Sequence, residues 1–206
     1  MGKRIGKKWD LPSEQNGALA VLGIAFLLGG GAGCLFAALS SGAGAQELGE
    51  YLIDYLSLAG EAGLSRDLWA LIWGHLKYLL VALLLSLTAL GVVGLPILFG
   101  ARGFFLSFSV ACFCRVFGGR GLFPASILFG LSALLWAAAL FLIGVTGLLS
   151  SWKLLRRSLG ESREGISLDG AYWCRTGLCV GLGIAAGLLE HWVVPVLLRA
   201  AARVVL

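Results

Sequence analysis

The chain has 206 residues, of which 59% are hydrophobic and 13% charged, whereas an ordinary soluble domain is roughly 25% charged. A water-soluble fold of this length could not bury so much apolar surface, so one integral membrane domain is expected over residues 1–206. The net charge of +5 does not indicate nucleic-acid binding, because the basic residues stand in short clusters between long uncharged runs.

A first membrane span is predicted over residues 17–40, because no charged residue lies between Glu14 and Glu47. This run is longer than the apolar region of a secretory signal, about 7–15 residues, so it is expected to remain as an anchor. Gly29 and Gly33 form a small-xxx-small pair that lets another helix approach closely. The run of glycines that starts at Gly29 leaves open a bend or an early end of the helix.

Residues 41–67 form an acidic loop with the pattern of an amphipathic helix. Apolar side chains recur at the spacing of one helical face, namely Leu48, Tyr51, Leu52, Tyr55 and Leu56. This helix is expected either to rest on the membrane surface or the bundle, or to dock a partner. The candidate docking residues are Glu47, Glu50, Tyr51, Asp54 and Tyr55.

The second span is predicted over residues 78–99, which carry no charge. His75 and Lys77 are expected at its interfacial start, where the lysine amine can extend to water. Gly94 and Pro96 lie toward its far end, so a kink or a break of the helix is expected there, because proline removes a helix hydrogen bond.

The third and fourth spans are predicted after a turn at Arg102. Residues 103–117 are short for a span and carry Arg115 near their end, so they either cross the membrane, which we favour, or form a re-entrant element. A long uncharged run then predicts a tilted fourth span over residues 124–151.

The last span is predicted over residues 176–189, after a basic cytoplasmic loop at 152–175. Glu190 and Pro195 are expected to mark its exit, and the apolar tail beyond them is expected to lie along the interface. Two further small-xxx-small pairs occur in this span, Gly177 with Gly181 and Gly183 with Gly187. The expected fold is therefore an all-α membrane bundle of about five transmembrane helices plus one extracytoplasmic amphipathic helix.

No group of residues in the sequence has the pattern of a catalytic or metal-binding site. The sequence has two histidines and lacks the HExxH, GxSxG and P-loop motifs, so no catalytic residue, metal site or cofactor is predicted and the chain is not expected to be an enzyme. The five cysteines are interpreted as packing residues. Transport needs ionisable residues within the spans, and Arg102 and Glu190 are expected near interfaces, so a permease subunit is the second choice.

An ordered set of short motifs resembles the stage II sporulation protein M family over nearly the whole chain. The motifs are HLKYL at 75–79, GLP at 94–96, Arg102 with Gly103 before a phenylalanine-rich stretch, Ser151 with Lys153 and the cluster at Arg156 and Arg157, Glu190, and Pro195 to Leu197. The family-like positions interpreted as structural are Lys77, Gly94, Pro96, Arg102, Gly103, Glu190 and Pro195.

The resemblance implies a membrane protein without hydrolase activity that acts while the mother cell engulfs the forespore. It would scaffold and localise two peptidoglycan-degrading partners, the stage II sporulation proteins D and P, at the sporulation septum or the engulfing membrane. Membrane lipid is the other expected partner. We expect the outside loop, through its candidate docking residues, to recruit the wall enzymes, although binding through the spans is an equally simple alternative.

The positive-inside rule predicts the orientation, because Lys and Arg are concentrated at the N-terminus and in the 152–175 loop. The N-terminus is then cytoplasmic, and five crossings put residues 41–67 and the C-terminus outside. Single-sided labelling of cysteines introduced into the 41–67 loop is expected to modify them from the extracytoplasmic side only. Labelling from the cytoplasmic side would contradict this orientation.

Overall fold

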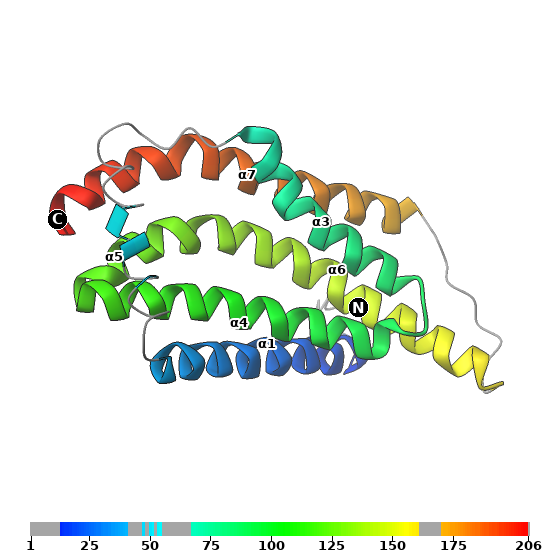
Figure 1. The fold of residues 1–206 in the computed structure, drawn as a ribbon. Coiled ribbons are helices and arrows are strands. Elements are labelled where there is room, and N and C mark those ends of the chain that lie inside the picture. Colours follow the sequence, from blue (N-terminus) through cyan, green and yellow to red (C-terminus); the bar gives the residue numbers. More distant parts are fainter. Residues whose placement is uncertain are drawn as a thin grey trace, which may run out of the picture.

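A computed structural model describes residues 13–40, 67–160 and 170–205, together with Glu47, Glu50, Tyr51, Ile53 and Asp54. The described part is an all-α bundle without strands. Its long helices are α1 (Ser13–Leu39), α3 (Leu68–Ser86), α4 (Gly91–Phe117), α6 (Leu131–Ser158) and α7 (Gly170–Val205), shown in Figure 1. The 3-10 turn η1 (Gly118–Gly121), the short helix α5 (Leu122–Ala125) and the π-helical turn η2 (Ser126–Gly130) connect α4 to α6.

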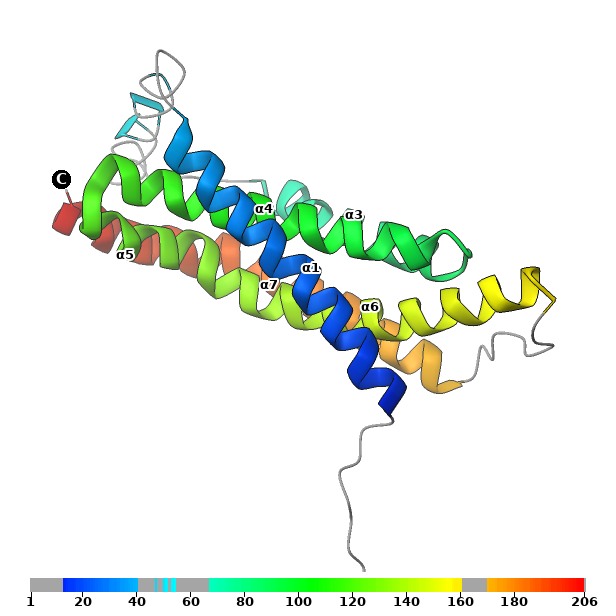
Figure 2. The ribbon, with the colours of Figure 1, turned by 90° about the horizontal axis from the view of Figure 1, so that it is seen from below.

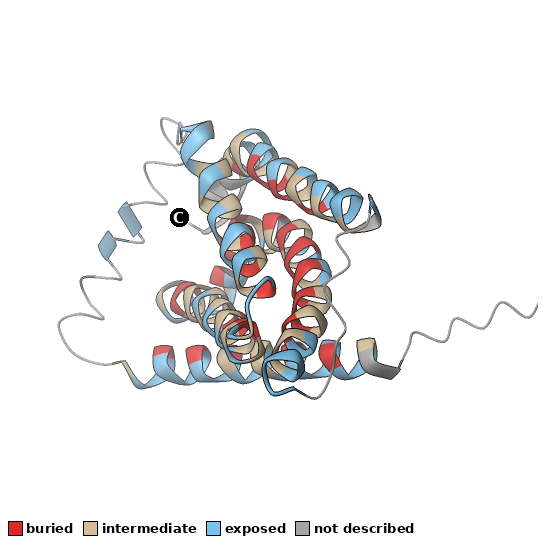
Figure 3. Cartoon of the chain, turned by 90° about the vertical axis from the view of Figure 1, so that its right-hand side faces the viewer, coloured by how far each residue is buried: buried red, intermediate tan, exposed pale blue. Residues whose placement is uncertain are grey.

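The outer surface of the bundle is apolar, as expected for a protein in a lipid bilayer. Five of its helical segments, of 19 to 33 residues, are long and apolar enough to cross a bilayer. Their outward faces carry large apolar side chains, such as Leu28 at 70% exposure and Leu134 at 73%, and Figure 3 shows the buried residues turned toward the interior. The chain is therefore a multi-pass membrane protein, as predicted.

The helices run in two directions. α1, α4 and α7 point one way and α3 and α6 the other (Figures 1 and 2). One end of the bundle, called here the amino end, contains the start of α1, the turn between α3 and α4, and the end of α6. The opposite end, called the α5 end, contains the end of α1, the start of α3, and α5.

Glycines hold α1 and α4 together in a parallel pair. A Cβ built on Gly29 would overlap the carbonyl oxygen of Gly100, and one built on Gly103 would overlap that of Phe26. Gly33 meets the backbone of α4 in the same way. The contact predicted for Gly29 and Gly33 is thus confirmed, because only residues without a side chain allow two backbones to approach this closely. The helix neither stops nor breaks at these glycines, since α1 continues to Leu39.

The chain reverses at residues 87–90, between α3 and α4, and not at Arg102 as predicted. Gly91 permits the tight turn, because a Cβ there would overlap the Leu85 carbonyl oxygen and the Ser151 hydroxyl. The Ser151 Oγ, fully buried on α6, donates to the Leu85 carbonyl at 3.1 Å. This bond joins α6 to the last turn of α3, where the Leu85 carbonyl also accepts from the backbone N–H and the hydroxyl of Thr88.

The predicted boundaries of spans two and three, 78–99 and 103–117, are therefore wrong. α3 starts at Leu68, where the Asp67 carboxylate accepts a hydrogen bond from the Trp69 backbone N–H at 3.3 Å. α4 is one continuous helix of 27 residues that includes Pro96 and Arg102, so residues 103–117 are not a re-entrant element. The uncharged run 78–99, predicted as one span, contains the turn at residues 87–90. Arg102, predicted to mark a turn, lies inside α4.

The last two spans also extend further than predicted. α6 ends at Ser158 rather than near residue 151, and the apolar segment that contains it begins at Ser126, close to the predicted start. α7 continues through Glu190 and Pro195 to Val205, so neither residue marks a helix exit and no separate tail follows. One of its two predicted glycine pairs packs against α3, because a Cβ built on Gly183 would crowd Leu79 and one built on Gly187 would crowd Ile72. The other pair, Gly177 with Gly181, has no described neighbour within 4 Å of a built Cβ.

Replacing Gly103 with leucine is expected to destabilise the protein by about 2 kcal/mol or more, because the new side chain must separate α1 from α4. The matched control is Gly31→Leu, an exposed mid-helix glycine with nothing within 4 Å of a built Cβ, which is expected to be neutral or slightly stabilising. Unfolding of both purified variants in mixed detergent micelles measures the difference. Equal effects would contradict the close helix contact.

Candidate functional site

Arg102 places a permanent positive charge inside the bundle. It lies on α4 about 16 Å from Gly91 at 1.5 Å per residue. Its guanidinium carbon lies 4.0 Å from the ring centroid of Tyr78 on α3 and 3.8 Å from that of Trp136 on α6. Such contacts stabilise a desolvated cation by about 2 kcal/mol or more. The two rings, 6.4 Å apart and nearly perpendicular, thus supply the stabilisation that water would otherwise give.

A second polar contact joins α3 to α7. The His75 Nε2 and the Glu190 Oε2 are 2.9 Å apart, and the two side chains are 14% and 13% exposed. When the imidazole Nε2 carries a proton it donates to the carboxylate, and with both ring nitrogens protonated the contact is an ion pair. His75 and Glu190 are 115 positions apart in the sequence, so the contact fixes how α3 and α7 pack.

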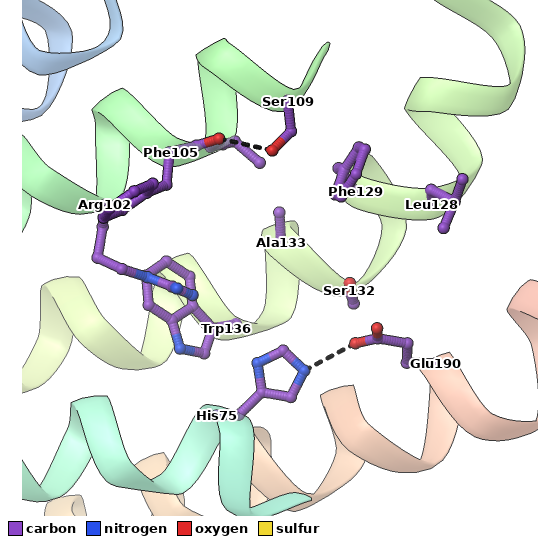
Figure 4. A pocket seen from close by; sticks show the side chains of 11 residues that line it. His75, Arg102, Phe105, Ser109, Leu128, Phe129, Ser132, Ala133, Trp136 and Glu190 are labelled. Atoms are coloured by element: carbon purple, nitrogen blue, oxygen red, sulfur yellow. Dashed lines mark hydrogen bonds and ion pairs between the residues drawn. The ribbon is translucent and has the colours of Figure 1, made fainter. Parts of the chain in front are cut away.

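Between these contacts lies a cavity of about 210 Å³ (Figure 4). His75, Arg102, Trp136 and Glu190 line it. The remaining lining residues come from α4, η2 and α6: Phe105, Leu106, Ser109, Leu128, Phe129, Ser132 and Ala133. Figure 4 shows Arg102 beside Trp136 at one end and Leu128 with Phe129 at the other. The cavity therefore extends along the bundle toward the α5 end.

Three buried nitrogens at this cavity have no hydrogen-bond partner within the described part of the chain: Arg102 Nε, Trp136 Nε1 and His75 Nδ1. The first two are always donors, and the third is a donor when the imidazole is protonated. Buried polar groups normally have partners, because an unmade bond in an apolar medium is costly. The cavity is therefore suited chemically to a group rich in hydrogen-bond acceptors.

The structure brings some of the family-like residues together and leaves others apart. Arg102 and Glu190, expected near interfaces, both line the cavity, and Gly103 packs against α1. Gly94 packs against the Leu85 side chain, and Pro96 and Pro195 lie inside helices. Lys77 is exposed on α3, with its amine 5.1 Å from the centroid of the Tyr78 ring.

The candidate docking residues lie elsewhere. Glu47, Glu50, Tyr51 and Asp54 have helical backbone and are exposed, which agrees with the predicted amphipathic helix at these four positions. Tyr55 lies outside the described residues. Their role in docking stays a prediction.

The sequence did not indicate that Tyr78 and Trp136 contact Arg102, or that Ser132 lines the cavity. His75 and Tyr78 are three residues apart and so share a helix face, which is the one signal in the sequence that links residues of the two polar contacts. Trp136 comes from another helix, and an aromatic residue in an apolar run carries no sign of the cation it will contact.

The described residues contain neither a metal-binding cluster nor a disulfide. No group of three or more His, Cys, Asp or Glu side chains lies close enough to hold a metal ion. All five cysteines are free, and Cys112 and Cys179 are buried, in keeping with a packing role.

Comparison with known proteins gives no match: no protein-family model, no curated protein and no solved structure is significantly similar to the chain. The resemblance drawn from the short motifs therefore stays a prediction.

The contact between His75 and Glu190 is expected to give a coupling energy of about 0.6–1.7 kcal/mol, the range found for polar contacts between membrane helices. The cycle uses His75→Leu, Glu190→Leu and the double variant, with the free energy of unfolding measured in mixed micelles. Glu190→Leu combined with Ser158→Ala, a substitution of the last residue of α6, serves as an additive control. A coupling energy of zero for the first pair would show that the contact does not stabilise the bundle.

Proposed function

We propose that the protein is a non-enzymatic membrane scaffold of the stage II sporulation protein M type. It anchors peptidoglycan-degrading partners, the stage II sporulation proteins D and P, at the septum and then at the engulfing membrane of the mother cell. The N-terminus is cytoplasmic, and the 41–67 segment faces the wall. The proposal is supported by the order of the motifs and by how their residues are used in the fold.

One observation supports the proposal: several of the motif residues make contacts between helices. His75 of the HLKYL motif contacts Glu190, and Arg102 lines the same cavity. Gly103 packs α4 against α1, and Ser151 donates to the last turn of α3. These motif residues therefore have a role in the packing of the bundle, as expected of a structural scaffold.

This use of the motif residues in helix packing suits a scaffold better than a transporter. The glycine contact between α1 and α4 is close, because the backbones of the two helices touch at Gly29 and Gly103. The contact between the His75 and Glu190 side chains holds α7 against α3. A bundle held at these points keeps the end of α1 and the start of α3 together at its α5 end.

Reversing the charges of Glu47, Glu50 and Asp54 to lysine is expected to lower recovery of the two partner proteins by about tenfold, since like charges across an interface repel. The assay is affinity capture from engulfing cells of an endospore-former that carries this chain in place of its own stage II sporulation protein M. Membrane abundance is measured in parallel. The matched control, Glu161→Lys with Glu164→Lys, makes similar charge reversals in the predicted cytoplasmic loop and is expected to leave recovery unchanged.

Two outcomes would separate the parts of this proposal. Unchanged recovery after the charge reversals would remove these residues as the docking surface and leave binding through the spans. Failure of the unaltered chain to recover either partner would overturn the scaffold itself.

A permease subunit is the second candidate, and the position of Arg102 favours it. Ionisable residues inside membrane segments commonly mark substrate or proton pathways, and here Arg102, His75 and Glu190 surround a cavity. Solute or proton flux into vesicles that contain the purified protein would support this candidate. Flux that is lost in Arg102→Gln and retained in Arg115→Gln would replace the scaffold proposal.

A further inference from the structure

The cavity contains a cation without an anion. Arg102 stays charged at any physiological pH, and no carboxylate among the described residues forms an ion pair with it. The nearest acidic side chain in the cavity lining, Glu190, contacts His75 at 2.9 Å. The two aromatic rings stabilise the guanidinium from its faces, but they cannot accept the bond that its Nε offers.

Two side chains that line the cavity contain buried donors suited to an anion. Arg102 Nε and Trp136 Nε1 are buried, lack a partner within the described residues and belong to side chains stacked on each other. Trp136 is only 3% exposed, so its N–H cannot turn to water at the surface. Arginine binds phosphate and carboxylate groups through paired N–H bonds, which makes phosphate a natural occupant.

The cavity is also open to lipid. Phe105 lines it and is 57% exposed, so one wall reaches the outer surface of the bundle. Most of the remaining lining is apolar, with Leu106, Leu128 and Phe129 lying between the cation and the α5 end. An occupant that enters past Phe105 needs an acidic group for Arg102 and apolar chains that remain against the lipid-facing wall, which is the chemistry of a phospholipid.

The cavity is large enough for a polar headgroup and lies well inside the bundle. A volume of 210 Å³ far exceeds the roughly 10–15 Å³ that a single water needs. Arg102 lies about 16 Å along α4 from Gly91, and His75 lies about 10 Å along α3 from Leu68, taking 1.5 Å per residue. Local thinning and long side chains bring headgroups and charges together over such distances.

We propose that this cavity binds the phosphate of an anionic phospholipid, with Arg102 and Trp136 donating to its oxygens and the acyl chains leaving past Phe105. Basic pockets between membrane helices bind phospholipid headgroups in this manner. Protonation of His75 adds a third donor, its Nδ1, while its Nε2 stays on Glu190. The site does not depend on the scaffold function, although a bound lipid would tie the bundle to membranes rich in that lipid.

The test is a lipid titration of the purified full chain in detergent, followed by native mass spectrometry. Phosphatidylglycerol is the probe, and inorganic phosphate and glycerol 3-phosphate supply the same group without acyl chains. Arg102→Gln is expected to weaken phosphatidylglycerol binding about tenfold or more, as for loss of a hydrogen bond from a charged group. Arg115→Gln is the charge-matched control on the same helix, where the Arg115 Nη1 donates to the Ala37 carbonyl outside the cavity.

A second variant tests the cavity without a change of charge. Ala133→Leu extends a lining side chain into the space and is expected to weaken lipid binding as well. Its control is Ala138→Leu, an exposed position on the same helix, which is expected to bind lipid as the unaltered chain does. Circular dichroism and the unfolding midpoint establish that each variant is folded.

Three results would overturn the proposal. The first is equal retention of phosphatidylglycerol by all four variants, which would indicate surface lipid only. The second is equally tight binding of inorganic phosphate, which would assign the site to a free anion. The third is no phosphate-bearing ligand at any concentration, which would leave a cavity filled by water.

Discussion

A charge in an apolar medium has to be stabilised by the protein itself, and in this bundle that constraint falls on Arg102. Its guanidinium lies between Tyr78 of α3 and Trp136 of α6, so three helices must meet at one level for the charge to be tolerated. The His75–Glu190 contact then attaches α7 to the same level. The cavity lies between these two contacts, and His75, Arg102, Trp136 and Glu190 line it.

At the amino end of the bundle, a hydrogen bond and a glycine hold the turn between α3 and α4 against α6. At the reversal after α3 the Leu85 carbonyl accepts hydrogen bonds from Thr88, and the buried hydroxyl of Ser151 donates to the same carbonyl. Gly91 leaves the space in which that hydroxyl and the Leu85 carbonyl meet. One glycine and one serine on different helices thus stabilise a turn that lacks charged residues, and they also anchor the end of α6 on α3.

The sequence predicted the number of spans because long uncharged runs are direct evidence of membrane helices. It did not predict their boundaries in the middle of the chain. The turn at 87–90 contains no charge and no proline, and Arg102 was interpreted as a loop residue because isolated charges usually lie at interfaces. What makes Arg102 tolerable inside α4 is two rings from other helices, and such long-range contacts leave no periodic pattern. Short-range patterns succeeded, as with the contact at Gly29 and Gly33.

The parallel contact of α1 with α4 has a consequence for the order of assembly. α1 leaves the ribosome first, yet its helical partners, α4 and α6, follow only after α3 has been made. Until α4 is inserted, α1 stays in the bilayer without its main partner, and the glycine surface around Gly29 and Gly33 is uncovered. Biogenesis of this protein is then a two-stage process, in which an independently stable first helix is captured by a later one, and substitutions at the glycine surface act on yield as well as on stability.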